Sequence, residues 1–168
     1  MSHTNIPKRR HMLGETAFLM EYLQAAYPGR RWITNMRVGP LEPHLPREGL
    51  SPAQRALMGA YRLFVDALVV MDRQLVVVET KIKNRAEGIG PLLRYVRLTP
   101  ATPELGEMQG WPVRGELVSP IPDPDVQREL ERVGLRFVYF EWKRLDEFMQ
   151  IYAERFRRAP LSEIETVF

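Results

Sequence analysis

Residues 61–81 read YRLFVDALVVMDRQLVVVETK, and this stretch decides the fold. It contains two runs rich in valine, leucine and phenylalanine, at 61–70 and 74–81, separated by Met71-Asp72-Arg73. Such residues favour β-strands, and a short polar link between two apolar runs is typical of a hairpin. The stretch therefore predicts two antiparallel strands that other elements cover on at least one face.

Hydrophobic periodicity and helix-capping residues predict the elements around this hairpin. Helices are expected over 14–27, 52–58, 92–98, 124–133 and 145–158, and further strands over 32–38, 113–118 and 136–142. Helices and strands alternate in the second half of the chain, which predicts an α/β sandwich around a mixed four- to five-stranded sheet flanked by helices. The 168 residues fit a basic N-terminal arm over 1–10 and a single domain over 11–168.

Composition excludes several classes of site. The chain has no cysteine, so it can form neither a disulfide nor a thiolate metal site, and its three histidines lack zinc-ligand spacing. The N-terminus lacks the apolar run of a signal peptide, and no apolar run approaches the roughly 20 residues that cross a bilayer. We therefore expect a cytoplasmic or phage-associated protein with no membrane partner. The net charge of +3 is only weak support for nucleic-acid binding.

Three charged residues, Asp66, Glu79 and Lys81, interrupt the apolar strands. Glu79 and Lys81 are two residues apart and share a face of their strand; Asp66 joins them if the hairpin register matches. Two converging carboxylates repel each other, and a divalent cation relieves that repulsion. Magnesium takes oxygen ligands and typically one or two carboxylates. A neighbouring lysine can hold the attacking water or stabilise charge on a phosphate.

Asp66 followed by Glu79-Thr80-Lys81 resembles the signature of the PD-(D/E)XK nuclease superfamily, with Val65 where many members have proline. The resemblance covers residues 12–142 and includes the order of a helix, a three-strand meander, a helix and a fourth strand. It implies a restriction-endonuclease-like fold and a Mg²⁺-dependent DNA endonuclease, such as a small phage or mobile-element nuclease, in which Mn²⁺ substitutes. Asp66, Glu79 and the backbone carbonyl of Thr80 would bind the metal. Lys81 would orient the nucleophilic water.

The resemblance implies further site residues. Many members carry a glutamate on the first helix, which here is Glu15, with Glu21 as the alternative; a glutamate in a first helical turn also simply suits the helix dipole. Residues 91–95, Pro-Leu-Leu-Arg-Tyr, keep the leucine and tyrosine of the Gln-Leu-X-X-Tyr pattern of exonuclease-like members but lack its glutamine. Contacts with DNA, chiefly with its phosphates, are expected from Lys83, Arg85, Arg94, Tyr95 and Arg97.

Other interpretations of the same residues stay open at this point. Asp66 could be a structural carboxylate paired with Arg62 or Arg94, and Glu79 and Lys81 could be ordinary charges on an edge strand. The whole chain could be a catalytically silent DNA-binding or structural subunit of a phage or transposition assembly, or a plain interaction module. A working nuclease could itself be a homodimer or a subunit of a larger DNA-processing assembly.

Overall fold

The computed structural model describes residues 6–40, 51 and 63–158, with side chains from 14 to 154 within those ranges. The helix expected over 52–58 lies outside the described residues, as do His3, His44, Arg62, residues 1–5 of the expected arm and the side chain of His11. Residues 6–10 of that arm form the first turns of a helix.

The centre of the fold is one five-stranded mixed sheet in the order β1-β2-β3-β4-β5. Its strands are β1 (Arg31–Val38), β2 (Leu63–Met71), β3 (Gln74–Thr80), β4 (Val113–Ser119) and β5 (Arg136–Tyr139). The first three pair antiparallel, whereas β4 and β5 join in parallel. The hairpin turn is only Asp72-Arg73, because Met71 already pairs with Gln74. A residue with positive φ, Arg73 at 58°, supplies the tight turn.

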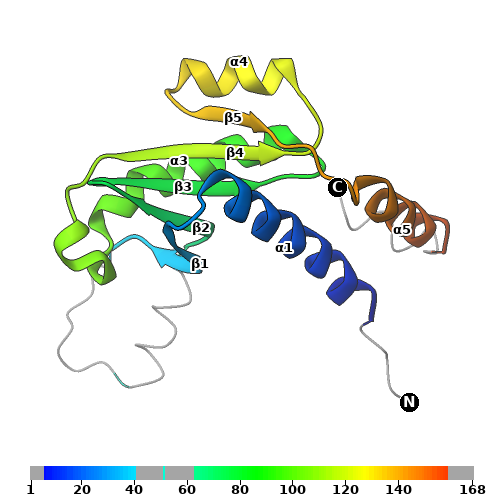
Figure 1. The fold of residues 1–168 in the computed structure, drawn as a ribbon, viewed down its shortest axis with the longest axis horizontal. Coiled ribbons are helices and arrows are strands. Elements are labelled where there is room, and N and C mark those ends of the chain that lie inside the picture. The colour runs from blue at the N-terminus through cyan, green and yellow to red at the C-terminus, as the bar shows by residue number, and fades with distance from the viewer. Residues whose placement is uncertain (1–5, 41–50, 52–62, 159–168) are drawn as a thin grey trace.

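Helices cover both faces of the sheet, and each face has its own apolar core (Figure 1). On one face lie α1 (Ile6–Ala26) and α5 (Leu145–Arg158), whose Phe18 and Phe148 pack with Val76 and Val78. On the other face lie α3 (Ile89–Leu98) and α4 (Pro124–Arg132). They pack on the strand residues that alternate with the first set, such as Leu75 and Val77. Short 3-10 segments, absent from the sequence prediction, occupy 85–88, 99–101 and 103–108.

The helix, three-strand meander, helix and parallel fourth strand stand in the order that the resemblance to PD-(D/E)XK nucleases implies. The predicted restriction-endonuclease-like α/β sandwich is therefore confirmed. Three predicted boundaries were wrong: α1 begins at Ile6 rather than near Gly14, α3 begins at Ile89 rather than Leu92, and β5 ends at Tyr139 rather than at Trp142. Within the described ranges, every helix is too short or too polar to span a lipid bilayer.

Close packing of α3 on the sheet depends on Gly115 in β4. A Cβ atom there would lie 2.7 Å from Val96 Cγ2 and 2.8 Å from Leu135 Cδ2, closer than these atoms can approach. We expect Gly115→Ala to lower the free energy of unfolding by about 1–3 kcal/mol, the usual cost of overpacking. Urea unfolding measures this. The matched control is Gly90→Ala in α3, where a Cβ meets nothing within 4 Å, and equal stability of both variants would contradict the packing argument.

Candidate active site

The register of the hairpin brings Asp66 and Glu79 together. Ala67 pairs with Val78, Asp66 and Glu79 are the next residues of the two strands, and the charge of Asp66 acts on the Glu79 carboxyl. Cross-strand neighbours in an antiparallel pair project from the same face. The condition that the sequence left open, a matching register, is met.

Strand β2 bends where Asp66 lies. Ala67 packs in the core on the α1 side, but Val65, two residues earlier, packs in the core on the α3 side, so the regular alternation breaks between them. In the neighbouring β1, Asn35 lies between the residues paired with positions 65 and 67 and has a φ of 51°. Irregularities of this kind re-aim a side chain relative to a flat sheet. Asp66 therefore projects from a bend at the end of the apolar sheet rather than from its interior.

The orientation of Asp66 is fixed by Thr80. Its Oδ2 accepts a hydrogen bond from the backbone N–H of Thr80 at 2.8 Å and from the Thr80 hydroxyl at 2.7 Å. The oxygen Oδ1 takes part in neither bond. No ion pair joins Asp66 to Arg94 among the described residues, so the structural pairing weighed for Arg94 does not form.

Glu79 and Lys81 form an ion pair at the end of the central strand β3. Lys81 Nζ lies 3.1 Å from Glu79 Oε1, with the Glu79 side chain 6% exposed and that of Lys81 32% exposed. Because β3 lies between β2 and β4, the interpretation of these residues as edge-strand charges is wrong. A charged pair whose carboxylate is this deeply buried calls for a specific role.

Burial, and after it the charge of Asp66, raise the pKa of Glu79 to about 7, and Lys81 only partly offsets these two effects. Burial also acts to lower the pKa of Lys81, but attraction from Glu79, Asp66 and Glu15 outweighs it, and the net shift is upward. The upward shift of the Lys81 pKa favours the charged ion pair, whereas that of the Glu79 pKa opposes it. The difference arises because the Glu79 carboxylate is far more buried than the Lys81 amine. The positive charge of Lys81 is therefore not enough to stabilise the ionised form of Glu79 fully.

Two more residues join this centre from the helices. Burial raises the pKa of Glu15 on α1, while the positive charges of Lys81 and Lys83 lower it, so Glu15 rather than Glu21 faces the centre. On the opposite side, burial and then the charges of Glu79 and Asp66 raise the pKa of Tyr95 on α3. The structure thus brings Glu15 and Tyr95 to the same centre as Asp66, Glu79 and Lys81.

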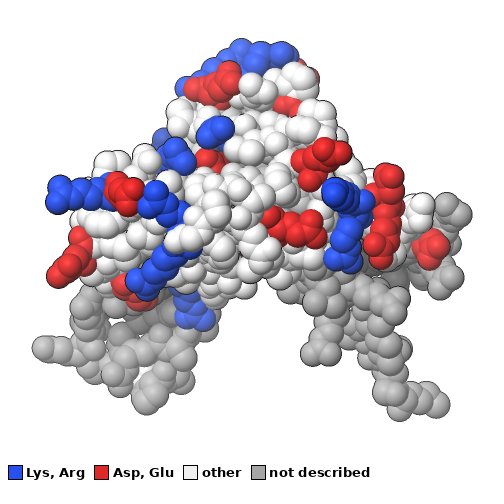
Figure 2. Space-filling view, in the orientation of Figure 1, with Lys and Arg blue, Asp and Glu red and all other residues white. Residues whose placement is uncertain are grey.

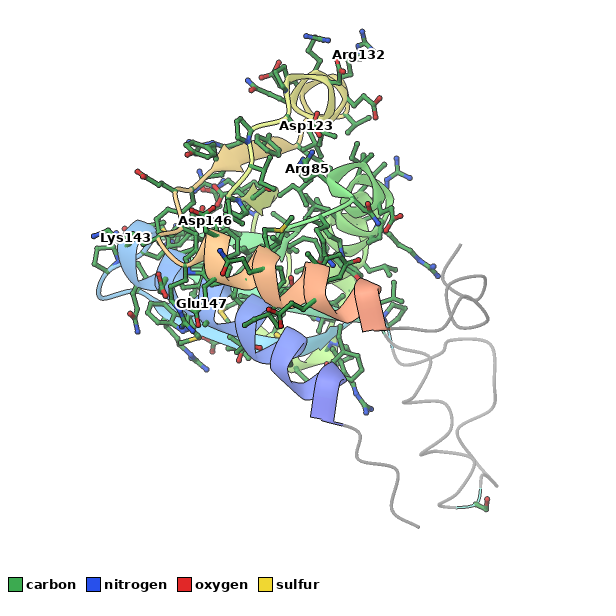
Figure 3. The ribbon with its side chains drawn as sticks, turned by 90° about the vertical axis from the view of Figure 1, so that its right-hand side faces the viewer. Arg85, Asp123, Arg132, Lys143, Asp146 and Glu147 are labelled. Carbon is green, nitrogen blue, oxygen red and sulfur yellow. The ribbon has the colours of Figure 1, made fainter. Side chains whose placement is uncertain are left out.

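The arginines predicted to contact DNA differ in their surroundings: two are exposed, and one is paired within the protein. Arg94 and Arg97 are exposed on α3. Arg85 is engaged within the protein, because its Nε lies 2.9 Å from Oδ2 of Asp123, the N-cap of α4 (Figure 3). The hydrogen bond from the backbone N–H of Val126, and after it the bond from Arg85, keep the pKa of Asp123 below its ordinary value. Arg85 therefore ties the segment after β3 to α4.

Lys83 lies against α5, with its Nζ 2.7 Å from the centroid of the Tyr152 ring. Strand β3 ends at Thr80, so strand alternation does not place Lys83 on the face of Lys81. The ring of Tyr152 instead holds Lys83 by a cation–π contact beside Glu15.

Charge alone does not mark a nucleic-acid interface on the face seen in Figure 2. Blue and red side chains are interspersed there around an uncharged centre. The case for this site therefore rests on its own geometry rather than on a basic surface.

The site residues fit a magnesium ion. Among the described residues, no group of three or more aspartate, glutamate or histidine side chains is arranged to hold a metal. Magnesium, however, keeps several waters and needs only one or two carboxylates, which Asp66 and Glu79 can supply. A buried Glu79 whose pKa is raised by a second carboxylate is the kind of group that a divalent cation stabilises in its charged form.

Sequence reasoning missed three parts of this centre: the hydroxyl of Thr80, the turn conformation of Asn35 and the ring of Tyr152. In the sequence, Thr80 looks like an ordinary strand residue. Asn35 offered a weak signal, because asparagine adopts a positive φ more often than most residues do. Tyr152 reaches Lys83 from 69 positions further along the chain (152 − 83), and no local pattern announces that contact.

No family model and no curated protein matches the chain. Among solved structures it is similar to a repair endonuclease from Pyrococcus abyssi, with 27% identity and a TM-score of 0.45 over 77% of this chain and 46% of that one. It is also similar to the protein in the EndoMS–dsDNA2 complex, with 25% identity and a TM-score of 0.44 over 77% and 44% of the two chains. A protein from Vibrio cholerae has 18% identity and a TM-score of 0.44 over 93% and 36%. The chain spans less than half the length of each of these three structures.

Proposed function

We propose that the chain is a divalent-cation-dependent DNA endonuclease whose centre is formed by Asp66, Glu79 and Lys81. One observation carries the proposal: Asp66, held by Thr80, lies close enough to Glu79 for its charge to act on that carboxyl, and the Lys81 amine lies 3.1 Å from Glu79 Oε1. Two acids and one amine at the end of an apolar sheet are the groups that hydrolysis of a phosphodiester uses.

Asp66 and Glu79, with the backbone carbonyl of Thr80, would hold Mg²⁺ or Mn²⁺. When bound, the cation supplies neutralising charge for the phosphate oxygens and makes water more acidic. The bonds from Thr80 to Oδ2 keep the Asp66 carboxylate in one orientation. A positioned ligand of this kind costs no reorganisation during the reaction.

Lys81 has the exposure and charge to act on the reacting groups. Its amine is one-third exposed and stays protonated, since the surrounding carboxylates raise its pKa. It can donate a hydrogen bond to the attacking water or to a phosphate oxygen as negative charge grows there. The water oxygen would bond to phosphorus, the 3′-oxygen would leave and take a proton, and the products would be a 5′-phosphate and a 3′-hydroxyl.

The remaining residues would position the substrate strand. Arg94 and Arg97 on the exposed side of α3 can contact phosphates, and Tyr95 on the same helix is close enough to the centre for Glu79 and Asp66 to raise its pKa. Glu15 would complete the outer ligand sphere by accepting from metal-bound water. Held by Tyr152, Lys83 would neutralise one phosphate on the α5 side.

Cleavage of supercoiled plasmid in Mg²⁺ tests the proposal. The parent should cut the plasmid, EDTA should stop the reaction, and Lys81→Met should reduce the rate about 10²-fold, the loss typical when one charge-stabilising donor is removed. The exposed Lys143 provides the matched control, since Lys143→Met should cut at the parental rate. If the two methionine variants cut equally fast, Lys81 has no catalytic role. If the parent does not cut at all, the chain is better described as a silent DNA-binding subunit.

A further inference from the structure

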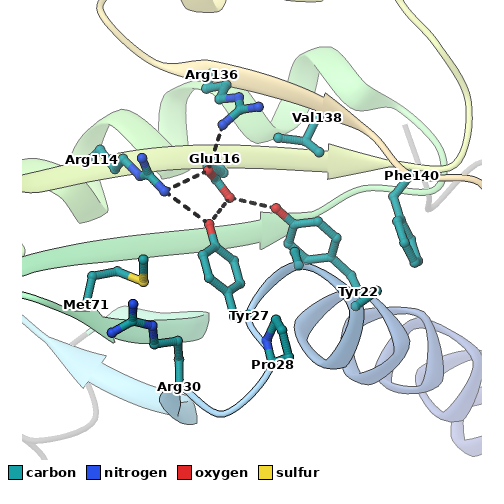
Figure 4. Close-up of a pocket in the computed structure, with 12 residues that line it drawn as sticks. Tyr22, Tyr27, Pro28, Arg30, Met71, Arg114, Glu116, Arg136, Val138 and Phe140 are labelled. Carbon is teal, nitrogen blue, oxygen red and sulfur yellow. Dashed lines mark hydrogen bonds and ion pairs between the residues drawn. The ribbon is translucent and has the colours of Figure 1, made fainter.

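A second polar site lies on the α1 side of the sheet. It is a pocket of about 680 Å³ between the end of α1, the hairpin end of β2 and the strands β4 and β5 (Figure 4). At its base, Glu116 in β4 pairs with Val78, which packs in the core on the α1 side. Asp66, Glu79 and Lys81 are not among the residues that line the pocket. The pocket is thus separate from the proposed nuclease centre.

Glu116 is a buried carboxylate with one saturated oxygen. Its side chain is 1% exposed, and Oε2 accepts hydrogen bonds from the hydroxyls of Tyr22 at 2.7 Å and Tyr27 at 2.6 Å. Burial, together with the charge of Glu116, raises the pKa of both tyrosines, so both remain protonated donors. This arrangement fixes the carboxylate and directs Oε1 toward two arginines.

Those two arginines are held loosely. Arg114 Nη2 and Arg136 Nη1 each lie 3.6 Å from Glu116 Oε1, beyond ordinary hydrogen-bond distance. By comparison, Arg85 approaches Asp123 to 2.9 Å in the same molecule. Figure 4 shows both guanidinium groups converging on Glu116 from different strands.

Arg114 and Arg136 have donors to spare. A guanidinium carries five N–H groups, and the contacts to Glu116 use one nitrogen of each arginine. Arg114 makes one other contact, a marginal bond of 3.5 Å to the Tyr27 hydroxyl, and its Nε is buried without a hydrogen-bond partner in the described part of the chain. Buried donors of this kind normally have partners.

The pocket lining carries excess positive charge. Three arginines, Arg30, Arg114 and Arg136, face one glutamate, an excess of two charges (3 − 1). Asp72, 87% exposed on the rim, offsets one of them through its contact with Arg30 at 2.9 Å. Apolar side chains of Met71, Val138 and Phe140 line the rest of the pocket.

From these contacts we propose that the pocket binds a phosphate monoester, with Arg114 and Arg136 as its principal donors. The lining keeps a net positive charge after Asp72 is counted, which matches the sign of a phosphate, and guanidinium groups bind phosphate oxygens in pairs. The apolar wall gives a sugar or base attached to the phosphate a surface to lie on. Two sources carry this chemistry: a free nucleotide and the 5′-phosphorylated end of a DNA strand. The site goes beyond the proposed nuclease centre and does not depend on it.

Calorimetry in EDTA at low salt tests this proposal. The probes are dAMP, deoxyadenosine, and one tetranucleotide with either a 5′-phosphate or a 5′-hydroxyl. At least one phosphorylated probe should bind about tenfold or more tightly than its unphosphorylated counterpart. Preference for dAMP identifies a free-nucleotide site, and preference for the tetranucleotide identifies a strand-end site. Equal binding with and without the phosphate, or no binding of any probe, would overturn the proposal.

Variants assign the binding to this pocket. Arg136→Gln and Arg114→Gln should each weaken binding of the phosphorylated probe about tenfold or more, with thermal unfolding confirming that both variants fold. Arg136→Gln should disturb folding less than Arg114→Gln, because the Arg136 side chain is 66% exposed. Arg128→Gln on α4, at 61% exposure, is the matched control and should bind as the parent does. Asp66→Ala should also bind normally, which separates this result from the nuclease centre. Unchanged binding in both arginine variants would refute the assignment.

Discussion

Replacing Asp66 with alanine should lower the rate of plasmid cleavage by at least about a thousandfold. Removing one charge-stabilising donor typically costs about 10²–10³ in rate, and this change removes a carboxylate that the metal needs. It also leaves the N–H and hydroxyl of Thr80 without their shared acceptor. Rates measured at several Mg²⁺ concentrations show whether the loss comes from weaker metal binding or from slower chemistry.

The matched control for this prediction is Asp72→Ala. Asp72 is also an aspartate of the β2–β3 hairpin, but it lies at the turn and is 87% exposed. We expect its variant to cleave plasmid within about twofold of the parent, since single exposed ion pairs contribute little. Equal losses in the Asp66 and Asp72 variants would show that the assay reports hairpin stability and not a metal ligand.

In metal-free buffer, the parent should lose about 3 kcal/mol of stability relative to Glu79→Gln as the pH rises from 4.5 to 7. Burial raises the pKa of Glu79 from 4.5 in the unfolded chain to about 7 in the folded protein. The folded state therefore prefers the protonated acid. Its contribution to stability is fully present below pH 4.5 and is lost as the pH rises through 7. Urea unfolding at closely spaced pH values measures the difference.

Divalent cations should reverse this loss, because they bind the ionised form of Glu79. At pH 8, Mn²⁺ should raise the Tm of the parent and leave that of Glu79→Gln nearly unchanged. Glu129→Gln, a substitution on the exposed side of α4, should follow the parent at every pH and in both buffers. A parent whose stability rises with pH above 5 relative to Glu79→Gln would contradict the buried, desolvated state of this carboxylate.

The sequence carried enough information to predict most of the sheet. The strands of 61–81 were recognisable because valine and leucine runs flank a short polar turn. Strand periodicity placed Glu79 and Lys81 on one face, and Asp66 was expected to join them only if the hairpin register matched. Asp123 and Pro124 marked the start of α4 for a local reason, since the Asp123 side chain caps the N–H of Val126. In each case the structure is determined by residues that are close together in the sequence.

Features that depend on distant residues were not predictable in this way. Arg85 looked like a DNA-contacting cation, yet it pairs with Asp123, which is 38 positions further along the chain. Glu116 reads as one more charge in a strand, and only the packing of α1 against β4 brings Tyr22 and Tyr27 to it. The side chains around such a group come from separate elements, and their meeting is decided by tertiary structure.

The central claim is that Asp66 and Glu79 bind one divalent cation. Anomalous diffraction from a crystal soaked in Mn²⁺ tests it most directly, because the signal locates the metal without assuming any activity. We predict one strong peak about 2.1 Å from a carboxylate oxygen of each residue, with Lys81 Nζ displaced from Glu79. A fully soaked crystal with no peak between these carboxylates, and with Lys81 still paired to Glu79, would contradict the account.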